Sequence, residues 1–139
     1  MSAVPYLASC VAIRGRAVLI EGPPGSGKSS LALALIDRGA TLVGDDGVLL
    51  ETRAGRLWAL PPPNIGGLLE IRNVGIVTLP AEAAPVALVL RLDQGAPRQI
   101  EGAEPVVLAG VPAPLVRLWP EASSLPLRAE WALALHGTE

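Results

Sequence analysis

The feature that most constrains this chain is the segment Gly22–Ser29, which reads GPPGSGKS and matches the pattern G-x-x-x-x-G-K-[ST] in full. A short apolar stretch, Ala17–Glu21, precedes it and is predicted as a buried strand. Lys28–Arg38 follows as a predicted helix that Gly39 ends. Glycines in such a turn let the backbone aim N–H groups inward, and the helix start adds the positive end of its dipole. The segment therefore predicts an anion-binding loop, and specifically a phosphate-binding one.

A phosphate loop of this kind predicts ATP with Mg²⁺ as the cofactors. Lys28 would reach the β- and γ-phosphates, and the Ser29 hydroxyl would bind Mg²⁺. Lys28 is also the only lysine in a chain with ten arginines, so the one compact ammonium stands where phosphate recognition needs it. The motif does not choose between kinases and ATPases, but GTPases lose ground because their N-K-x-D motif would need a second lysine. The predicted nucleotide contacts are Gly22, Pro23, Pro24, Gly25, Ser26, Gly27, Lys28, Ser29 and Ser30.

Length and composition predict one domain, spanning residues 1–139, that is cytosolic and binds neither nucleic acid nor membrane. Half of the residues are apolar, but no uninterrupted apolar run approaches the length of a bilayer span. The start of the chain lacks the basic and apolar regions of a secretion signal. A net charge of −2 argues against a general nucleic-acid binder. The single cysteine, Cys10, lies among apolar residues and is predicted to be buried.

Strand signals outnumber helix signals in the rest of the chain, which predicts an α/β domain with a mixed β-sheet. From Gly95 onward the sequence is rich in proline, and only a helix starting in Trp131–Leu135 is predicted there. A hairpin is predicted around Thr52-Arg53-Ala54-Gly55 and an irregular loop at 61–67. The predicted strands are Thr41–Val43, Val48–Glu51, Arg56–Leu60, Leu68–Ile71, Ile76–Leu79 and Val86–Leu92.

Two later segments carry acids that could complete a site for phosphoryl transfer. Asp45 and Asp46 follow the predicted strand that comes after the helix, where the chain returns toward the phosphate loop. Gly44 and Gly47 flank them, so a solvated turn is the alternative interpretation. Glu70 and Arg72 are two residues apart and would share one face of a strand, as an acid for metal and a cation for phosphate. The alternative there is a solvent-facing ion pair.

These residues together resemble the HPr kinase/phosphorylase family over roughly Tyr6 to Leu79. That family places an Asp-Asp pair shortly after its phosphate-loop helix, as RGATLVGDD does at 38–46 here. It also has a signature similar to L-E-I-R-G-x-G-I, against LEIRNVGI at 69–76. The resemblance implies a P-loop-containing mixed-sheet domain with the nucleotide-binding fold of HPr kinase and PEP carboxykinase. It also implies a short form without the N-terminal domain of longer members, and a homo-oligomer, commonly a hexamer.

The activity implied by the resemblance is ATP-dependent phosphorylation of a serine on HPr, a phosphocarrier protein of the bacterial phosphotransferase system. Some members also run the reaction backward with inorganic phosphate. By resemblance, Asp46 would be the base that takes the serine proton, with Asp45 supporting it. Ser29 and Glu70 would hold Mg²⁺, and Arg72 would face the phosphates beside the catalytic Lys28.

The chain also departs from the family pattern. Leu7 stands where the family usually has a histidine, Ser30 where an acid commonly follows the loop, and Asn73 where the signature has glycine. Arg128 is a weak counterpart of the family's later arginine-rich loop, and His136 is predicted to be a solvated tail residue. Two other functions therefore stay open: a nucleotide sensor with weak or lost catalysis, and a small-molecule P-loop kinase. The second would need a lid of arginines, which are scattered at Arg91, Arg98, Arg117 and Arg128.

Overall fold

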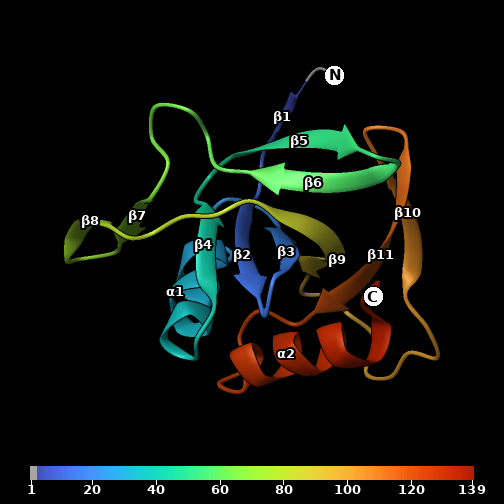
Figure 1. The fold of residues 1–139 in the computed structure, drawn as a ribbon. Coiled ribbons are helices and arrows are strands. Elements are labelled where there is room, and N and C mark those ends of the chain that lie inside the picture. The colour runs from blue at the N-terminus through green and yellow to red at the C-terminus, as the bar shows by residue number, and fades with distance from the viewer. Residues whose placement is uncertain (1–2) are drawn as a thin grey trace.

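The structure is a computed structural model that describes residues 3–139, and it is an α/β domain built on a mixed sheet (Figure 1). The central strands are β2 (Ser9–Ile13), β3 (Arg16–Glu21), β4 (Thr41–Gly44) and β9 (Ala84–Leu92). Strand β3 pairs in parallel with β9 and antiparallel with β2, and β4 continues the sheet beyond β2. The predicted fold class, α/β with a mixed sheet, is confirmed.

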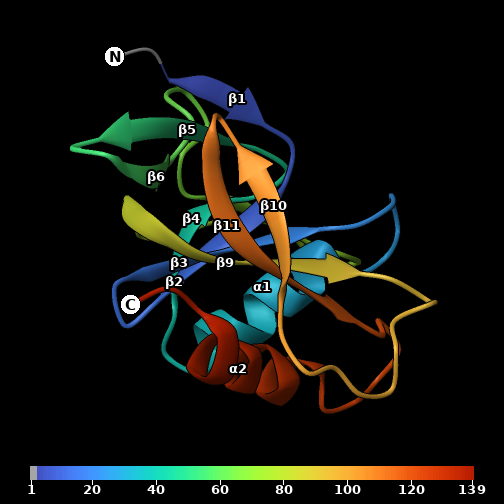
Figure 2. The ribbon, with the colours of Figure 1, turned by 90° about the vertical axis from the view of Figure 1, so that its right-hand side faces the viewer.

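The two helices cover one face of the central sheet, as Figures 1 and 2 show. Helix α1 (Lys28–Asp37) and helix α2 (Leu125–His136) share a buried cluster with apolar side chains of that face, among them Val18, Ile20 and Leu90. The intervening residues Ala17 and Leu19 point the other way into a second cluster. Strand β3 is therefore buried on both faces, which explains why its sequence is apolar throughout rather than alternating.

The other face is covered by a smaller sheet that folds over it (Figure 1). This sheet contains β1 (Val4–Tyr6), β5 (Val48–Arg53) and β6 (Arg56–Leu60), and its edge joins the start of β9. The predicted hairpin between β5 and β6 is present. Its two-residue turn, Ala54-Gly55, has positive φ at both positions, as a type I′ turn requires.

A short hairpin projects from the body of the domain beside α1 (Figure 1). It consists of β7 (Leu68–Ile71) and β8 (Gly75–Thr78), both close to their predicted ranges. Leu69 is fully buried, whereas Val74 and Ile76 toward the tip are 76% and 68% exposed. One buried anchor thus holds a largely exposed hairpin that carries Glu70 and Arg72.

The proline-rich part of the chain contains more structure than the sequence predicted. Strands β10 (Glu104–Leu108) and β11 (Val111–Leu118) form a hairpin, and β11 pairs in parallel with β9. The predicted start of the terminal helix within Trp131–Leu135 is wrong, because α2 begins at Leu125. Pro126 lies in the first turn of α2, where its missing N–H costs no helical hydrogen bond. Neither helix within residues 3–139 has the length and apolar character needed to cross a bilayer.

Candidate phosphate-binding and catalytic site

The phosphate loop connects the carboxyl end of β3 to the first turn of α1, as the sequence predicted. Gly25 and Gly27 have φ of 78° and 100°, in the left-handed region that glycine adopts without strain. Gly22 is required for space: a Cβ there would lie 2.7 Å from Ser26 Oγ and 3.1 Å from Leu92 Cβ. The loop therefore has the tight, glycine-dependent shape that directs backbone N–H groups toward an anion.

The Lys28 ammonium lies over this loop. Lys28 Nζ donates hydrogen bonds to the carbonyl oxygens of Gly22, at 3.0 Å, and Pro23, at 3.3 Å. The Ser26 hydroxyl in the same loop is buried and has no hydrogen-bond partner within residues 3–139. A buried polar atom without a partner is costly, and an oxygen of a bound phosphate would satisfy it. The loop residues thus fit the nucleotide that the sequence predicted.

Asp45 is the carboxylate that connects the loop to the rest of the site. The Ser29 hydroxyl donates to Asp45 Oδ1 at 2.6 Å, and the Ser9 hydroxyl donates to the same oxygen at 3.1 Å. The backbone N–H of Glu70 points to Asp45 Oδ2 at 3.4 Å. Because Ser29 gives its proton to Asp45, its oxygen lone pairs remain available for a metal ion.

Asp46 occupies a different environment from its neighbour. It is exposed, and it has a φ of 58°, which turns the chain so that its side chain lines the pocket over the phosphate loop. The bend is tight: a Cβ on Gly44 would lie only 2.3 Å from the Gly47 carbonyl oxygen. The two interpretations of this segment are therefore compatible, because a turn presents Asp46 at the pocket while Asp45 faces inward.

The projecting hairpin supplies the remaining polar groups. Glu70 and Arg72 are exposed and both line the pocket, whereas the neighbouring Leu69 is buried. No ion pair joins Glu70 to Arg72 within the part of the chain that the structure describes. The solvent-facing ion pair, the alternative considered for these two residues, is thus not formed.

One pocket of about 490 Å³ therefore collects residues from four segments. It combines the loop, the second acid of the pair and the signature hairpin, and its volume is in the range of small-molecule sites. Leu7 also lines it and is 79% exposed. The residues that line this pocket are Leu7, Ala8, Glu21, Gly22, Pro24, Gly25, Gly27, Lys28, Ser29, Ser30, Asp46, Glu70 and Arg72.

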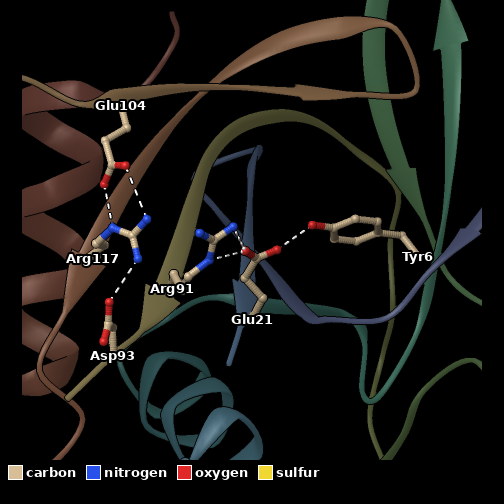
Figure 3. A network of polar contacts seen from close by, with 6 residues as sticks. All are labelled: Tyr6, Glu21, Arg91, Asp93, Glu104 and Arg117. Carbon is tan, nitrogen blue, oxygen red and sulfur yellow. Dashed lines mark hydrogen bonds and ion pairs between the residues drawn. The ribbon is translucent and has the colours of Figure 1, made fainter. Parts of the chain in front are cut away.

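A hydrogen-bonded network behind the loop was not predicted from the sequence (Figure 3). Glu21, the last residue of β3, accepts hydrogen bonds from the Tyr6 hydroxyl and from Arg91 Nε, the latter at 2.6 Å. Arg91 also forms an ion pair with Glu21. Burial, followed by the adjacent Glu21 carboxylate, raises the pKa of Tyr6, so the phenol stays protonated as a donor. The available signal was an acid placed directly before a phosphate loop, where its charge needs a cation.

Several residues considered from the sequence lie outside this pocket. Cys10 is fully buried, as predicted, and burial raises the pKa of its thiol. Arg128, on α2, donates to Ser124 Oγ just before the helix. Arg128 and His136 both line a separate cavity. His136 is the last residue of α2 and is half-buried, so it belongs to the helix rather than to a tail beyond it.

The oxygen ligands near the phosphate loop suit Mg²⁺ held jointly by protein and phosphate better than a metal ion held by protein side chains alone. Within residues 3–139 no group of three or more His, Cys, Asp or Glu side chains is placed to hold an ion. Mg²⁺ is usually bound by one or two carboxylates together with phosphate oxygens and water. Ser29 and Glu70, which both line the pocket, could supply that share of the ligands.

The fold and this site define a P-loop nucleotide-binding domain of the α/β class. The profile of the HPr Serine kinase C-terminal domain matches residues 3–82, which is more than half of the chain. The chain belongs to this family.

Individual relatives agree with this membership. The chain is 42% identical over 71 residues to the HPr kinase/phosphorylase of Clostridium tetani, a match covering 51% of this chain and 23% of that protein. It is 33% identical over 138 residues to the one from Streptococcus agalactiae, covering 81% of this chain and 44% of that protein. The chain thus spans less than half of the length of these curated relatives.

A solved structure extends the similarity over most of the fold. The Hpr(Ser) kinase/phosphatase from Coxiella burnetii superposes with a TM-score of 0.80 at 28% sequence identity. The match covers 94% of this chain and 88% of that one. The proline-rich part, beyond the residues that the family profile matches, therefore belongs to the same fold.

Proposed function

We propose that this chain is an ATP-dependent protein-serine kinase that phosphorylates an HPr-type phosphocarrier protein. The observation that carries the proposal is the single pocket in which Asp46, Glu70 and Arg72 face the phosphate loop with Lys28 and Ser29. That residues so far apart in the sequence line one pocket beside the loop supports transfer of a γ-phosphate there. Membership of the HPr kinase family supplies the acceptor.

In the proposed reaction the chain positions the reactants and neutralises charge. The loop N–H groups and Lys28 would hold the phosphates, and Arg72 would add a second cation in the same pocket. Mg²⁺, when bound, would neutralise the charge of the phosphate oxygens. Ser29 and Glu70 would hold it, and Asp45 would orient the Ser29 hydroxyl for that purpose.

Asp46 is proposed as the general base. It would accept the proton of the acceptor serine while the serine oxygen forms a bond to the γ-phosphorus and the bond from phosphorus to the bridging oxygen of ADP breaks. Its exposure and its place at the pocket leave it accessible to a protein substrate. Asp45 is less suited to this role because both of its oxygens already accept hydrogen bonds.

Reverse phosphorolysis is proposed to be weak in this chain. Leu7 lines the pocket at the position where the family usually has a histidine, and an alkyl side chain cannot exchange a proton. The same observation favours a second candidate function, a nucleotide sensor that binds ATP with little turnover. Assembly as a homo-oligomer and a cytoplasmic location are carried over as proposals from the family.

The test is a transfer assay with γ-labelled ATP, Mg²⁺ and purified HPr-type carriers of both the sugar and the nitrogen branch. We expect label on a carrier serine, and no transfer by a Lys28→Met variant. Replacing the acceptor serine of the carrier by alanine is the matched control. Tight ATP binding without label on any carrier would favour the sensor and contradict the kinase.

A further inference from the structure

A second cavity, of about 500 Å³, lies against the outer flank of the phosphate loop. Loop residues 23–26 form one wall of it. Residues 92–94, after β9, and Pro120 and Glu121, after β11, form the rest. Pro24 and Gly25 line both this cavity and the phosphate pocket, so the two cavities are neighbours on either side of the loop.

The sheet topology places this cavity next to the phosphate loop, where a ligand with its phosphates in the loop would extend. Strands β3, β9 and β11 are parallel neighbours, and the loops after their carboxyl ends meet at one edge of the sheet. Ligands of α/β domains bind outside the carboxyl ends of such strands. Asp46 follows β4, which lies on the other side of β3, beyond β2. A ligand with phosphates in the loop therefore has its reacting end toward Asp46 and its opposite end toward the second cavity.

The two cavities also differ in whether cationic side chains line them. The phosphate pocket contains the cations Lys28 and Arg72 beside its acids Glu21, Asp46 and Glu70. The second cavity is lined by two carboxylates, Asp93 and Glu121, and by no lysine or arginine. This cavity would repel phosphate but suits a neutral group rich in hydrogen-bond donors. Carboxylates in nucleotide-binding folds commonly accept hydrogen bonds from ribose hydroxyls.

Asp93 is held in place as an acceptor (Figure 3). Its Oδ1 accepts the Gly95 backbone N–H at 2.8 Å and its Oδ2 accepts from Arg117 at 2.9 Å, while Arg117 also pairs with Glu104. The Gly95 hydrogen bond and the Arg117 guanidinium hold the pKa of Asp93 below its usual range, so it stays ionised. Each carboxylate oxygen has a further lone pair for a ligand.

We propose that this cavity is the nucleoside subsite of the triphosphate site. Asp93 and Glu121 accept hydrogen bonds from the ribose hydroxyls. Gln94, whose amide both donates and accepts, faces the purine, a pairing that suits the N6 and N7 atoms of adenine. The inference rests on the proposed function only in taking a nucleoside triphosphate as the ligand.

The test separates the nucleoside from the phosphates. Calorimetric titration with Mg²⁺ compares ATP, 2′,3′-dideoxy-ATP and inorganic triphosphate on the full chain and on Gln94→Ala, Glu121→Ala and the double variant. Asp93 is left intact because its replacement would also release Arg117. Each single variant should weaken ATP binding about tenfold, the value of one hydrogen bond with an ionised or buried partner. Triphosphate binding should change less than about twofold, a change well below one lost hydrogen bond.

Two controls make the pattern specific. Glu101→Ala, an exposed acid outside both cavities, should leave all three ligands unaffected, and Lys28→Met should weaken all three. In addition, Glu121→Ala should reduce the preference for ATP over its dideoxy analogue, because only Asp93 would then accept from the ribose hydroxyls.

The proposal is overturned if the wild type binds ATP no more tightly than triphosphate. It is also overturned if the variants weaken both ligands equally, or weaken neither. These readouts are equilibrium affinities, so failure to phosphorylate a carrier would contradict the proposed function and leave this result standing.

Discussion

The Ser29 hydroxyl donates a hydrogen bond of 2.6 Å to Asp45 Oδ1 and thereby joins the start of α1 to the end of β4. Ser9 of β2 and the backbone of Glu70 in β7 bond to the same carboxylate. Asp45 is thus a positioning residue on which four segments converge. Its neighbour Asp46 remains available at the pocket.

Replacing Asp45 by alanine should therefore destabilise the domain, whereas replacing the exposed Asp46 by asparagine should not. Asp45→Ala leaves the Ser9 and Ser29 hydroxyls without their acceptor, which should lower the free energy of unfolding by about 1–3 kcal/mol. Asp46→Asn, which keeps a residue that tolerates a φ of 58°, should stay within about 0.5 kcal/mol of the wild type, as exposed positions usually do. Urea unfolding followed by circular dichroism measures both, and equal losses would contradict the assigned difference.

Asp46→Asn should leave nucleotide binding largely intact and cut phosphoryl transfer by about 100-fold or more, as loss of a general base does. Asparagine tolerates the left-handed backbone conformation that Asp46 adopts, so the bend should persist. Single-turnover transfer from ATP to the carrier provides the measurement. Transfer at the wild-type rate would remove Asp46 from the role of base.

The bend that contains Asp45 and Asp46 should require glycine at its first position, Gly44, but not at its last, Gly47. An alanine Cβ at Gly44 would lie 2.3 Å from the Gly47 carbonyl oxygen and 2.8 Å from Val48 Cγ1. Gly44→Ala should thus cost about 1–3 kcal/mol, the usual range for overpacking. Gly47→Ala is the matched control, because a Cβ there meets no atom within 4 Å. Comparable urea midpoints for the two variants would show that the backbone accommodates a Cβ at residue 44 without loss of stability.

Cys10 should resist alkylation while the chain is folded. The residue is fully buried and burial raises the pKa of its thiol, so the reactive thiolate is scarce at neutral pH. Mass spectrometry after iodoacetamide treatment should show unmodified native protein and complete modification in urea. Rapid modification of the native protein would mean that β2 opens frequently.

The acid side of the stability profile should depend on Arg117. Hydrogen bonds and the Arg117 charge lower the pKa values of Asp93 and Glu104 in the folded state. Their contribution to stability is therefore present above the unfolded-state pKa values, near about 4, and is lost as the pH falls through the lower folded-state values. Arg117→Gln should flatten this part of the profile of urea midpoints against pH. An unchanged slope would show that other carboxylates dominate.

The elements that surround the phosphate loop could be predicted because local pattern and tertiary role agree there. Ala17–Glu21 is continuously apolar because β3 is buried on both faces, and the helix after the loop ends where Gly39 was expected to end it. The strand pattern of β7 likewise placed Glu70 on the open side, and Arg72, also exposed, lies in the turn directly after the strand. The local pattern could not show which acid of the pair faces the pocket, because this depends on the positive φ of Asp46, and only the family resemblance indicated Asp46.

The proline-rich strands were missed because their prolines occupy permitted positions. Pro105 faces Pro114 in the β10–β11 hairpin, and β11 pairs with β9 only over Leu115–Leu118, beyond its prolines. A missing N–H at such places removes no hydrogen bond from the central sheet. Sequence shows the proline but not which neighbour, if any, would have used its N–H.

The enclosure of β3 between the two buried clusters has a consequence for how the domain meets its ligand. The strand can separate from its neighbours only when the whole domain opens, so the segment that carries Gly22 is as persistent as the fold itself. A nucleotide that binds as proposed would therefore meet a backbone that is already ordered. Little of its binding free energy is consumed in ordering the backbone from which the loop emerges.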